Sequence, residues 1–421
     1  MSTVSTSVIV VICLFGLIQA LNLQSAIFNS DPEKNWAVLV AGSDGWSNYR
    51  HQSDVCHAYQ ILAGLGIPKE NIITFMYDDI ANNEENPYPG KIFNDYNHKD
   101  VYSGVQIDYK GSDVNPKVFM QVMKGDLQLK AAGRKVLERN GGTQSEIYAC
   151  WKSTGPQDNV FVFFSDHGGE GLICFPEDDL YARQLNETIT YMYENKRYNQ
   201  MVIYIEACYS GSMFRGILSP SIQVYATTAA NPSESSWATF CEDKTIDTCL
   251  ADEYSYNWMV DTETHDTHNW TLNKQFKNVK QATKLSHVKK YGNKSKVADS
   301  KPSVRAHLIR LMRSVMSATT EDEHDSAKRR LHRALQMGTI VEHTFDDIIT
   351  EVEKRYKPSG NQIDKLEQLK CFEAVFEVFK RYCFTIQQVP EVAQHVSKLH
   401  QLCRAGYQPE DLVDSVMHVC A

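Results

Sequence analysis

The sequence of 421 residues predicts an α/β fold with a mostly parallel sheet flanked by helices, followed by an all-α C-terminal module. Short apolar runs alternate with segments of helical spacing from residue 36 to residue 229, as in parallel sheets that are buried on both faces. The composition then changes at residues 291–303 (YGNKSKVADSKPS), a stretch typical of a linker. Almost everything beyond this stretch has helical periodicity.

The elements of the first domain follow from the length and apolarity of each run. The predicted strands cover residues 36–41, 71–77, 159–164, 201–205 and 221–227. The predicted helices cover residues 53–65, 115–138 and 185–195, and the last of these connects two parallel strands. Residues 138–153 (ERNGGTQSEIYACWKS) are Gly-containing and polar, so we expect an exposed insertion there.

The C-terminal module is predicted to contain six helices and two disulfide bonds. The helices are expected over residues 304–319, 325–337, 343–356, 362–384, 390–405 and 408–420. The bonds are expected among four clustered cysteines, Cys371, Cys383, Cys403 and Cys420. Elsewhere, Cys241 and Cys249 could bridge a loop, and Cys56 and Cys174 are interpreted as buried thiols.

Composition and targeting signals indicate a secreted protein. A formal net charge of −9 argues against a general nucleic-acid surface, and the mean hydropathy of −0.40 fits a soluble protein without a membrane span. The apolar run 8–20 is too short to cross a membrane and suits a signal peptide cleaved after Ala20. Glycosylation sequons begin at Asn186, Asn269 and Asn293.

Two short motifs carry the chemistry. Asp166-His167-Gly168 and Glu206-Ala207-Cys208 each follow a predicted strand, and in open α/β sheets functional groups gather where the strands end. At a shared edge an imidazole can handle protons while a thiolate attacks a carbonyl. Each residue alone could be an ordinary core histidine or a small buried thiol, but the Gly-rich neighbours of both favour catalysis.

At this point the sequence resembles the legumain family, asparaginyl endopeptidases of the caspase-like cysteine protease clan. The resemblance runs in order from about residue 36 to residue 292 and more weakly through the helical tail. Six segments carry it: 40–60 (VAGSDGWSNYRHQSDVCHAYQ), 76–81 (MYDDIA), 163–171 (FFSDHGGEG), 185–193 (LNETITYMY), 204–214 (YIEACYSGSMF) and 224–236 (VYATTAANPSESS).

The resemblance implies a catalytic role for each matching residue. Cys208 would be the nucleophile, His167 would promote the thiolate and protonate the leaving amine, and Asn48 would orient the histidine. The backbone amides of Gly168 and Cys208 would hold the oxyanion. Asp166 matches the family aspartate that can close to a succinimide, a feature linked with peptide ligation.

The resemblance also implies a substrate pocket for asparagine, whose side chain has an acceptor oxygen and a donor nitrogen. Arg50 would face the oxygen, and Glu206 and Asp252 would face the nitrogen. Ser235 or Ser236 would shape the wall. Aspartate would be accepted only when protonated, and hence at low pH.

The implied organisation is a zymogen. After the signal peptide and a short propeptide (21–35), it has a catalytic domain (36–292), a linker or activation segment (293–345) and an inhibitory prodomain (346–421). The implied partners are protein and peptide substrates, the chain's own prodomain and cystatin-type inhibitors, in a lysosome-like acidic compartment or outside the cell. No cofactor is expected, and no metal, because the Cys and His spacings fit no zinc pattern.

The tail also bears on regulation. Residues 303–421 carry 16 Lys and Arg against 17 Asp and Glu, and seven of the 14 histidines. We expect a response to pH between about 5 and 7, with release coming from carboxylates that gain protons, because histidine protonation would strengthen attraction to an acidic domain. No asparagine occurs between Ser295 and Gly360, so we expect cleavage at Asp322 or Asp325 in acid, or by another protease near residues 328–330.

Two alternatives remain open at this stage. One is the catalytic subunit of the lipid-anchor transamidase, which shares the His and Cys motifs; the other is a non-catalytic binding protein, such as a decoy for protease inhibitors. Two departures from the family pattern are noted: Asp44 replaces an asparagine of many relatives, and the insertion at 138–153 puts extended-substrate preference in doubt.

Overall fold

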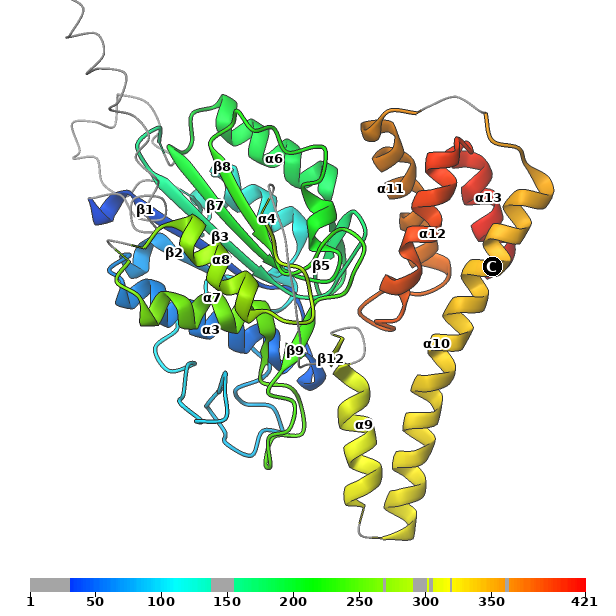
Figure 1. Cartoon of the computed structure of the whole chain (residues 1–421), viewed down its shortest axis with the longest axis horizontal. Helices are drawn as coiled ribbons and strands as arrows, with labels where there is room; N and C mark the ends of the chain where they lie inside the picture. Colours follow the sequence, from blue (N-terminus) through cyan, green and yellow to red (C-terminus); the bar gives the residue numbers. More distant parts are fainter. Residues whose placement is uncertain are drawn as a thin grey trace, which may run out of the picture.

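The computed structural model describes residues 31–137, 155–267, 270–290, 301–302, 306–318, 320–359 and 363–421. The expected signal peptide, most of the short propeptide, the 138–153 insertion, most of the linker and the sequons at Asn269 and Asn293 lie outside these residues. No helix in the described part of the chain is long and apolar enough to cross a membrane. A sheet domain and a group of C-terminal helices lie side by side (Figure 1).

A six-stranded sheet forms the centre of the first domain, in the order β11-β8-β7-β3-β1-β2. All neighbours are parallel except β11, which pairs antiparallel with β8, so the predicted mostly parallel sheet is confirmed. The strands are β1 (Asn35–Ala41), β2 (Ile72–Phe75), β3 (Asn159–Ser165), β7 (Gln200–Glu206), β8 (Val224–Thr228) and β11 (Lys289–Lys290).

Two small three-stranded sheets lie beyond the strand ends of the central sheet. One has the order β4-β5-β6 and follows directly after β3. The other has the order β10-β9-β12 and includes a strand from the linker region. Their strands are β4 (Gly168–Gly169), β5 (Leu172–Cys174), β6 (Asp179–Tyr181), β9 (Trp237–Thr239), β10 (Ala251–Asp252) and β12 (Lys301–Pro302).

Helices cover both faces of the central sheet (Figure 1), because alternate residues of each buried strand face opposite sides. Leu39, Phe163 and Tyr204 pack in one cluster with residues of α3 (Tyr49–Gly64), α7 (Glu253–Thr264) and α8 (Leu272–Ala282). Val38, Val162 and Ile203 pack in the other with residues of α4 (Pro116–Met123) and α6 (Ala182–Glu194).

Two helices of this domain differ from the prediction. The single helix expected over residues 115–138 is wrong: α4 ends before Gly125, which has a positive φ of 62°, and the short α5 (Leu127–Ala131) starts anew after Asp126. The Asp126 carboxylate caps α5 by accepting hydrogen bonds from Gln128 and Leu129 amides. Helix α3 begins four residues earlier than expected, directly after the 3₁₀ turn η2 (Trp46–Asn48).

The C-terminal module consists of α9 (Ala306–Ser317), α10 (Glu321–Arg355), α11 (Lys365–Tyr382), α12 (Val392–Ala405) and α13 (Pro409–Cys420). The two helices predicted over 325–337 and 343–356 are one continuous helix of 35 residues. A capping box between Thr320 and Glu323 starts it. The expected boundary between linker and prodomain, at 345–346, therefore falls inside α10.

Disulfide bonds join the prodomain helices as predicted. Cys371 of α11 is bonded to Cys403 of α12, and Cys383, just after α11, is bonded to Cys420 of α13. The Cys241–Cys249 bond also forms, and Cys56 and Cys174 are buried free thiols. Each of these cysteine predictions is confirmed.

Candidate active site

The histidine and cysteine motifs meet at one edge of the sheet. Strands β3 and β7 are parallel neighbours with Ser165 opposite Glu206, so His167 and Cys208 both lie two residues beyond the paired ends. The Asp166 amide donates a hydrogen bond to the Glu206 carbonyl, at 3.1 Å, which holds the two chain exits together. A Cβ on Gly168 would come within 2.7 Å of the Cys208 carbonyl oxygen, so this contact requires glycine.

Asn48 fixes the orientation of the His167 ring. The His167 Nε2 atom lies 3.0 Å from the Asn48 side-chain oxygen, and because that oxygen only accepts, Nε2 is the protonated nitrogen. The Asn48 amide nitrogen donates to the Asp44 carbonyl, at 2.9 Å, so the asparagine is itself held in place. The other ring nitrogen, Nδ1, is buried without a hydrogen-bond partner in the described structure and is left with a free lone pair.

Burial keeps both reactive groups neutral in this structure. Cys208 is fully buried, its Sγ lies 3.8 Å from the Ser236 hydroxyl, and burial raises the pKa of the thiol. Burial, with the nearby Arg50 and His307 charges, holds the pKa of His167 well below its usual value. A thiolate–imidazolium pair is therefore disfavoured while the site is covered.

The cover comes from the C-terminal helices. Cys208 packs in one hydrophobic cluster with residues of α10, α11, α12 and α13, and Ile386 and Val396 lie against Gly169. On α12, His400 Nε2 lies 2.5 Å from the Glu170 carbonyl oxygen, to which it donates. The active-site edge is thus buried by side chains of the same chain.

Polar contacts surround this apolar cover. Glu373 accepts two hydrogen bonds from the Arg183 guanidinium, at 2.7 and 2.8 Å. Lys380 Nζ lies 3.0 Å from carboxylate oxygens of both Asp178 and Asp179. Arg404 pairs with the Glu170 carboxylate at 3.6 Å, and the Gln387 side chain donates to Asp166. Several separate polar contacts therefore join the module to the sheet domain.

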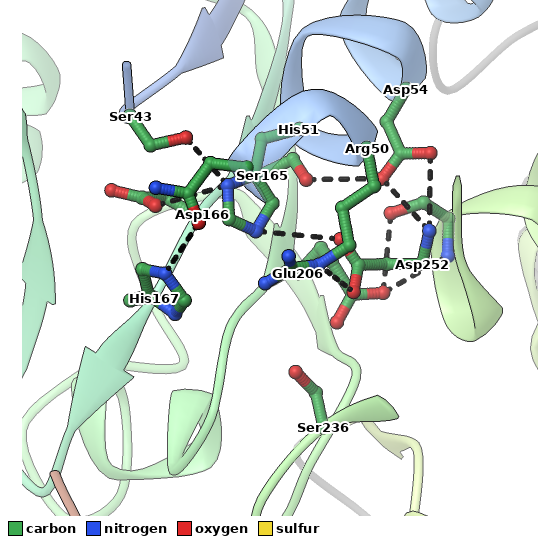
Figure 2. A network of polar contacts seen from close by, with 12 residues as sticks. Ser43, Arg50, His51, Asp54, Ser165, Asp166, His167, Glu206, Ser236 and Asp252 are labelled. Atoms are coloured by element: carbon green, nitrogen blue, oxygen red, sulfur yellow. Dashed lines mark hydrogen bonds and ion pairs between the residues drawn. The ribbon is translucent and has the colours of Figure 1, made fainter. Parts of the chain in front are cut away.

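Arg50, Glu206 and Asp252, three of the residues proposed to bind the substrate, belong to a buried polar network (Figure 2). Arg50 Nε donates to Asp252 Oδ1 at 3.0 Å, and Glu206 Oε2 accepts from the Ser255 amide and hydroxyl, at 3.1 and 3.2 Å. The second oxygens, Glu206 Oε1 and Asp252 Oδ2, are buried without hydrogen-bond partners in the described structure. Ser236 is buried at the same place, and Ser235 is partly exposed. All five predicted pocket residues are therefore close to the rim.

Sequence reasoning missed Asp54, a fully buried carboxyl on α3. Its oxygens accept from the Asn94 amide, at 3.0 Å, and from the Ser165 hydroxyl, at 3.1 Å, and they face the Asp252 amide at 3.4 Å. Burial and the nearby Asp252 raise the pKa of Asp54 well above its usual value. The spacing of Arg50 and Asp54, one helical turn apart, is the signal that could have identified it.

His51 is a second missed residue. Its Nδ1 lies 2.6 Å from the Ser43 hydroxyl and 3.2 Å from Asp166 Oδ1, and its ring meets that of His167 edge-on at 5.1 Å between centroids. Ligand atoms of His51, Asp166 and His167 lie within 4.8 Å of one another, so this trio is geometrically able to approach a cation. These three residues include His167, so they belong to the candidate active site.

Asp166 is shared between the site and the cover. Its Oδ2 accepts a hydrogen bond from the Gln387 side chain, at 2.8 Å, and Gln387 also donates to the Phe175 carbonyl at 3.2 Å. The succinimide candidate is thus held by a residue of the C-terminal module.

Comparison with known proteins fits this geometry. Residues 35–305 match the model of the peptidase C13 family, and residues 321–420 match that of the legumain prodomain. The chain is 45% identical to "Hemoglobinase" of Schistosoma japonicum over 93% of this chain and 94% of that protein. It is 41% identical to "Legumain" of Bos taurus with the same coverage. A solved caspase-1 structure from Spodoptera frugiperda matches with a TM-score of 0.33 at 10% identity, over 62% of this chain and 83% of that one.

A thiol and an imidazole at one sheet edge, within a peptidase family match of this extent, define a cysteine endopeptidase. The chain belongs to the peptidase C13, or legumain, family. Its C-terminal helices correspond to the family's prodomain, so the structure is that of a zymogen. The transamidase and the non-catalytic alternatives are thereby set aside.

Proposed function

We propose that the active enzyme hydrolyses peptide bonds after asparagine, and after aspartate in acid. One observation carries the proposal: Arg50 pairs with Asp252 next to Glu206 (Figure 2), and Glu206 Oε1 and Asp252 Oδ2 make no hydrogen bond, the latter lying 3.5 Å from His51 Nε2. An asparagine side chain would present its oxygen to the guanidinium and its NH₂ group to those two oxygens. Analogues lacking the amide would leave these buried groups unpaired and be rejected strongly.

The catalytic roles follow from the same geometry. Cys208 Sγ attacks the carbonyl carbon of the scissile bond while His167 Nδ1 takes the thiol proton and passes it to the leaving amine. Water then hydrolyses the thioester and regenerates the thiol. Asn48 positions the imidazole, and the amides of Gly168 and Cys208 would hold the oxyanion.

Selectivity between asparagine and aspartate should depend on pH. Burial and repulsion by neighbouring carboxylates raise the pKa of Glu206 well above its usual value, and burial raises that of Asp252. Both groups therefore gain protons in milder acid than exposed carboxylates do, and a protonated pocket carboxyl can donate to an aspartate substrate. Turnover after aspartate relative to asparagine should rise as the pH falls.

The test is turnover of paired reporters. Acid-activated enzyme is given Ala-Ala-Asn and Ala-Ala-Asp amide reporters across a series of pH values, beside Cys208→Ser and Arg50→Ala variants. We expect Cys208→Ser to abolish both activities and Arg50→Ala to raise KM for the asparagine reporter. Equal turnover of a glutamine or alanine reporter would refute the assignment of the pocket.

We propose peptide ligation as a side activity of the same site. Attack of the His167 amide nitrogen on the Asp166 carboxyl carbon, with loss of one water, would give a succinimide. While the prodomain is docked, Gln387 holds the Asp166 carboxylate. Mass spectrometry of the peptide containing Asp166, before and after activation, would detect the loss of water, and its absence in ligating enzyme would exclude this route.

We propose entry into the secretory pathway and function in an acidic, lysosome-like compartment or outside the cell, with cystatin-type inhibitors as partners. Support comes from the N-terminal apolar run and from the sequon at Asn186, which lies partly exposed on α6. Of the three sequons, it is the one within the described residues. Treatment of the cell-made protein with an endoglycosidase should reduce its mass, and an unchanged mass would argue against glycosylation.

A further inference from the structure

Helix α9 lies next to the catalytic rim, in contact with the η2 turn. The preceding strand β12 pairs antiparallel with β9, with Pro302 opposite Trp237, so the chain there runs toward Ser236 and the substrate pocket. A substrate whose N-terminal part paired with β9 in the same way would run in this direction. Helix α9 comes later in the chain and contacts the η2 turn that carries Asn48. Burial, with the charges of Arg50 and of His307 in the first turn of α9, lowers the pKa of His167.

Two arginines of α9 bind the catalytic domain beside this rim. The Arg313 guanidinium donates to three backbone carbonyls, those of Cys241, Asp243 (3.4 Å) and Ile246 (3.3 Å). Arg310, one turn earlier, pairs with the carboxylates of Glu85 and Asp247, the latter at 3.5 Å. We call the three carbonyls and the two carboxylates the arginine cup.

The catalytic domain alone holds the cup in shape. The Cys241–Cys249 disulfide closes the loop that supplies the carbonyls. Asp243 accepts from the amides of Thr245 and Ile246, at 2.8 and 2.9 Å, and from His98 at 2.7 Å, and these hydrogen bonds lower its pKa to about 2 despite partial burial. No residue of α9 takes part in these contacts, so the cup should persist when α9 leaves.

Asp247 is held in the same way. Its Oδ1 accepts from the Trp46 indole, at 2.8 Å, and Trp46 belongs to the η2 turn beside Asn48. The cup therefore adjoins the catalytic residues through a buried aromatic side chain. Once α9 has been released, these carbonyls and carboxylates would lack the arginine donors, and a guanidinium with five N–H groups suits that arrangement.

We propose that, in active enzyme from which a second cut ahead of α9 has released this helix, the arginine cup is a substrate subsite that binds an arginine on the C-terminal side of the scissile bond. This inference rests on the proposed function. His307 and Arg313 are six residues apart on a helix, which corresponds to about 9 Å along the axis. An extended peptide covers that distance in about three residues. The favoured substrates thus carry arginine about three residues after the cleaved bond.

The experiment compares quenched peptides cleaved by activated enzyme whose mass shows that the chain ends before α9. Enzyme cut only within α10 keeps α9 on the cup and should show no preference for arginine. All have asparagine before the bond, and arginine or its uncharged isostere citrulline stands at the second, third, fourth or fifth position after it. We expect arginine at the best position to raise kcat/KM about fivefold, mainly through KM, as a partly exposed ion pair of about 1 kcal/mol would. Higher salt should reduce the advantage.

Variants then locate the effect. Glu85→Gln combined with Asp247→Asn, which keeps the acceptor for Trp46, should remove most of the preference for arginine. Glu84→Gln is the matched control, since Glu84 is an exposed neighbour with the same charge. The Ala-Ala-Asn reporter ends at the scissile bond, so its turnover reports on the catalytic centre alone.

If that reporter is cleaved but arginine and citrulline peptides are cleaved equally, or the preference survives in the double variant, the cup is not a subsite. If the reporter itself is not cleaved, the proposed function has failed.

Discussion

At the scale of single residues, the zymogen keeps its reactive pair uncharged. Burial raises the pKa of Cys208 and lowers that of His167, so both shifts oppose the thiolate–imidazolium form that attacks substrates. The cover responsible belongs to the C-terminal helices, which pack around Cys208. Latency therefore has a chemical component in addition to steric exclusion.

This account predicts the reactivity of the thiol. Cys208 should be alkylated by iodoacetamide far more slowly in the zymogen than in the activated enzyme, because thiolate is scarce and access is blocked. The measurement is the alkylation rate by mass spectrometry of the peptide containing Cys208. Cys56, buried in the core of the catalytic domain away from the C-terminal helices, serves as an internal control and should stay unmodified in both forms. Equal rates at Cys208 before and after activation would contradict the prediction.

A second prediction concerns Asp54, which acts on the pocket through Asp252 and on the catalytic loop through Ser165. Asp54→Asn keeps the size but replaces one acceptor oxygen with a donor nitrogen. We expect about a tenfold loss of kcat/KM for the asparagine reporter, equivalent to about 1.4 kcal/mol, with an altered pH dependence of the asparagine-to-aspartate ratio. A loss of activity with an unchanged ratio and a lower melting temperature would indicate a purely structural role.

The candidate site was largely predictable from the sequence, for a physical reason. His167 and Cys208 directly follow two apolar runs that form adjacent parallel strands, so their meeting point follows from the strand pattern. Asp54 and His51 were not predicted, because the partners that tie them to the site, Ser165 and Asp166, lie more than 100 positions away in the chain. Local spacing does not show such contacts.

At the scale of elements, helix α12 carries a histidine that should make prodomain docking sensitive to pH. His400 is buried against the Phe372 ring, at 3.7 Å between centroids, and burial with the nearby Lys365 and Arg404 charges lowers its pKa to about 3. Once released into water the imidazole should return to about 6.5. The released state therefore binds the proton more tightly, and docking is fully favoured above about pH 6.5 and weakens as the pH falls toward 3.

The environment of His400 differs from the one that the sequence expectation assumed. Histidine protonation was expected to strengthen docking, which holds for an exposed histidine facing an acidic surface. His400 instead is buried. Two cations, Lys365 and Arg404, lie near it, and the carboxylate of Glu170 is already paired with Arg404. Burial also raises the pKa of Glu170 and Asp179, so protonation of these two carboxyls does not by itself favour release. A histidine and not only carboxylates should thus drive the transition.

The corresponding variant is His400→Gln, whose amide can still donate to the Glu170 carbonyl but does not titrate. The pH at which the prodomain dissociates should move lower, because up to about 1.4 kcal/mol of acid destabilisation per pH unit is lost. Dissociation is measured by gel filtration of Cys208→Ala protein cleaved in the linker, across a pH series. His332→Gln, at an exposed position of α10, is the control. An unshifted midpoint in His400→Gln would exclude this role.

The elements themselves were predicted unevenly. The buried strands were recognised because long apolar runs admit few alternatives, and their observed ends differ from the prediction by at most three residues. Helix boundaries were harder. Gly125 breaks a segment with continuous helical spacing. Helix α10, in contrast, continues through a stretch predicted as two helices, because the packing of Val341 and Phe345 stabilises it.

At the scale of the whole molecule, we expect activation to require a cut between the catalytic domain and the prodomain. Asp322 and Asp325 lie exposed in the first two turns of α10, as do Lys328, Arg329 and Arg330 just after them. Helix ends fray, so a protease can reach these bonds without unfolding the disulfide-bonded core.

We predict that acid-treated wild-type zymogen is cut after Asp322 or Asp325, and that the Cys208→Ala protein is not. N-terminal sequencing and mass mapping of the products provide the measurement. Cleavage of the Cys208→Ala protein at residues 328–330 by an added trypsin-like protease would show that the segment is accessible. If the inactive variant is processed at the same aspartates without any added enzyme, self-cleavage is wrong.

The length of α10 has a consequence for how the enzyme is switched on. Helix α10, about 50 Å long, runs from the segment where cleavage is expected to the packed C-terminal helices that cover Cys208. Cleavage near the start of α10 does not touch the contacts between the later helices and the catalytic domain, so cleavage alone should not expose the active site. The cleaved prodomain can then act as a reversible inhibitor in trans, and cleaved enzyme that is returned to neutral pH can be inhibited again.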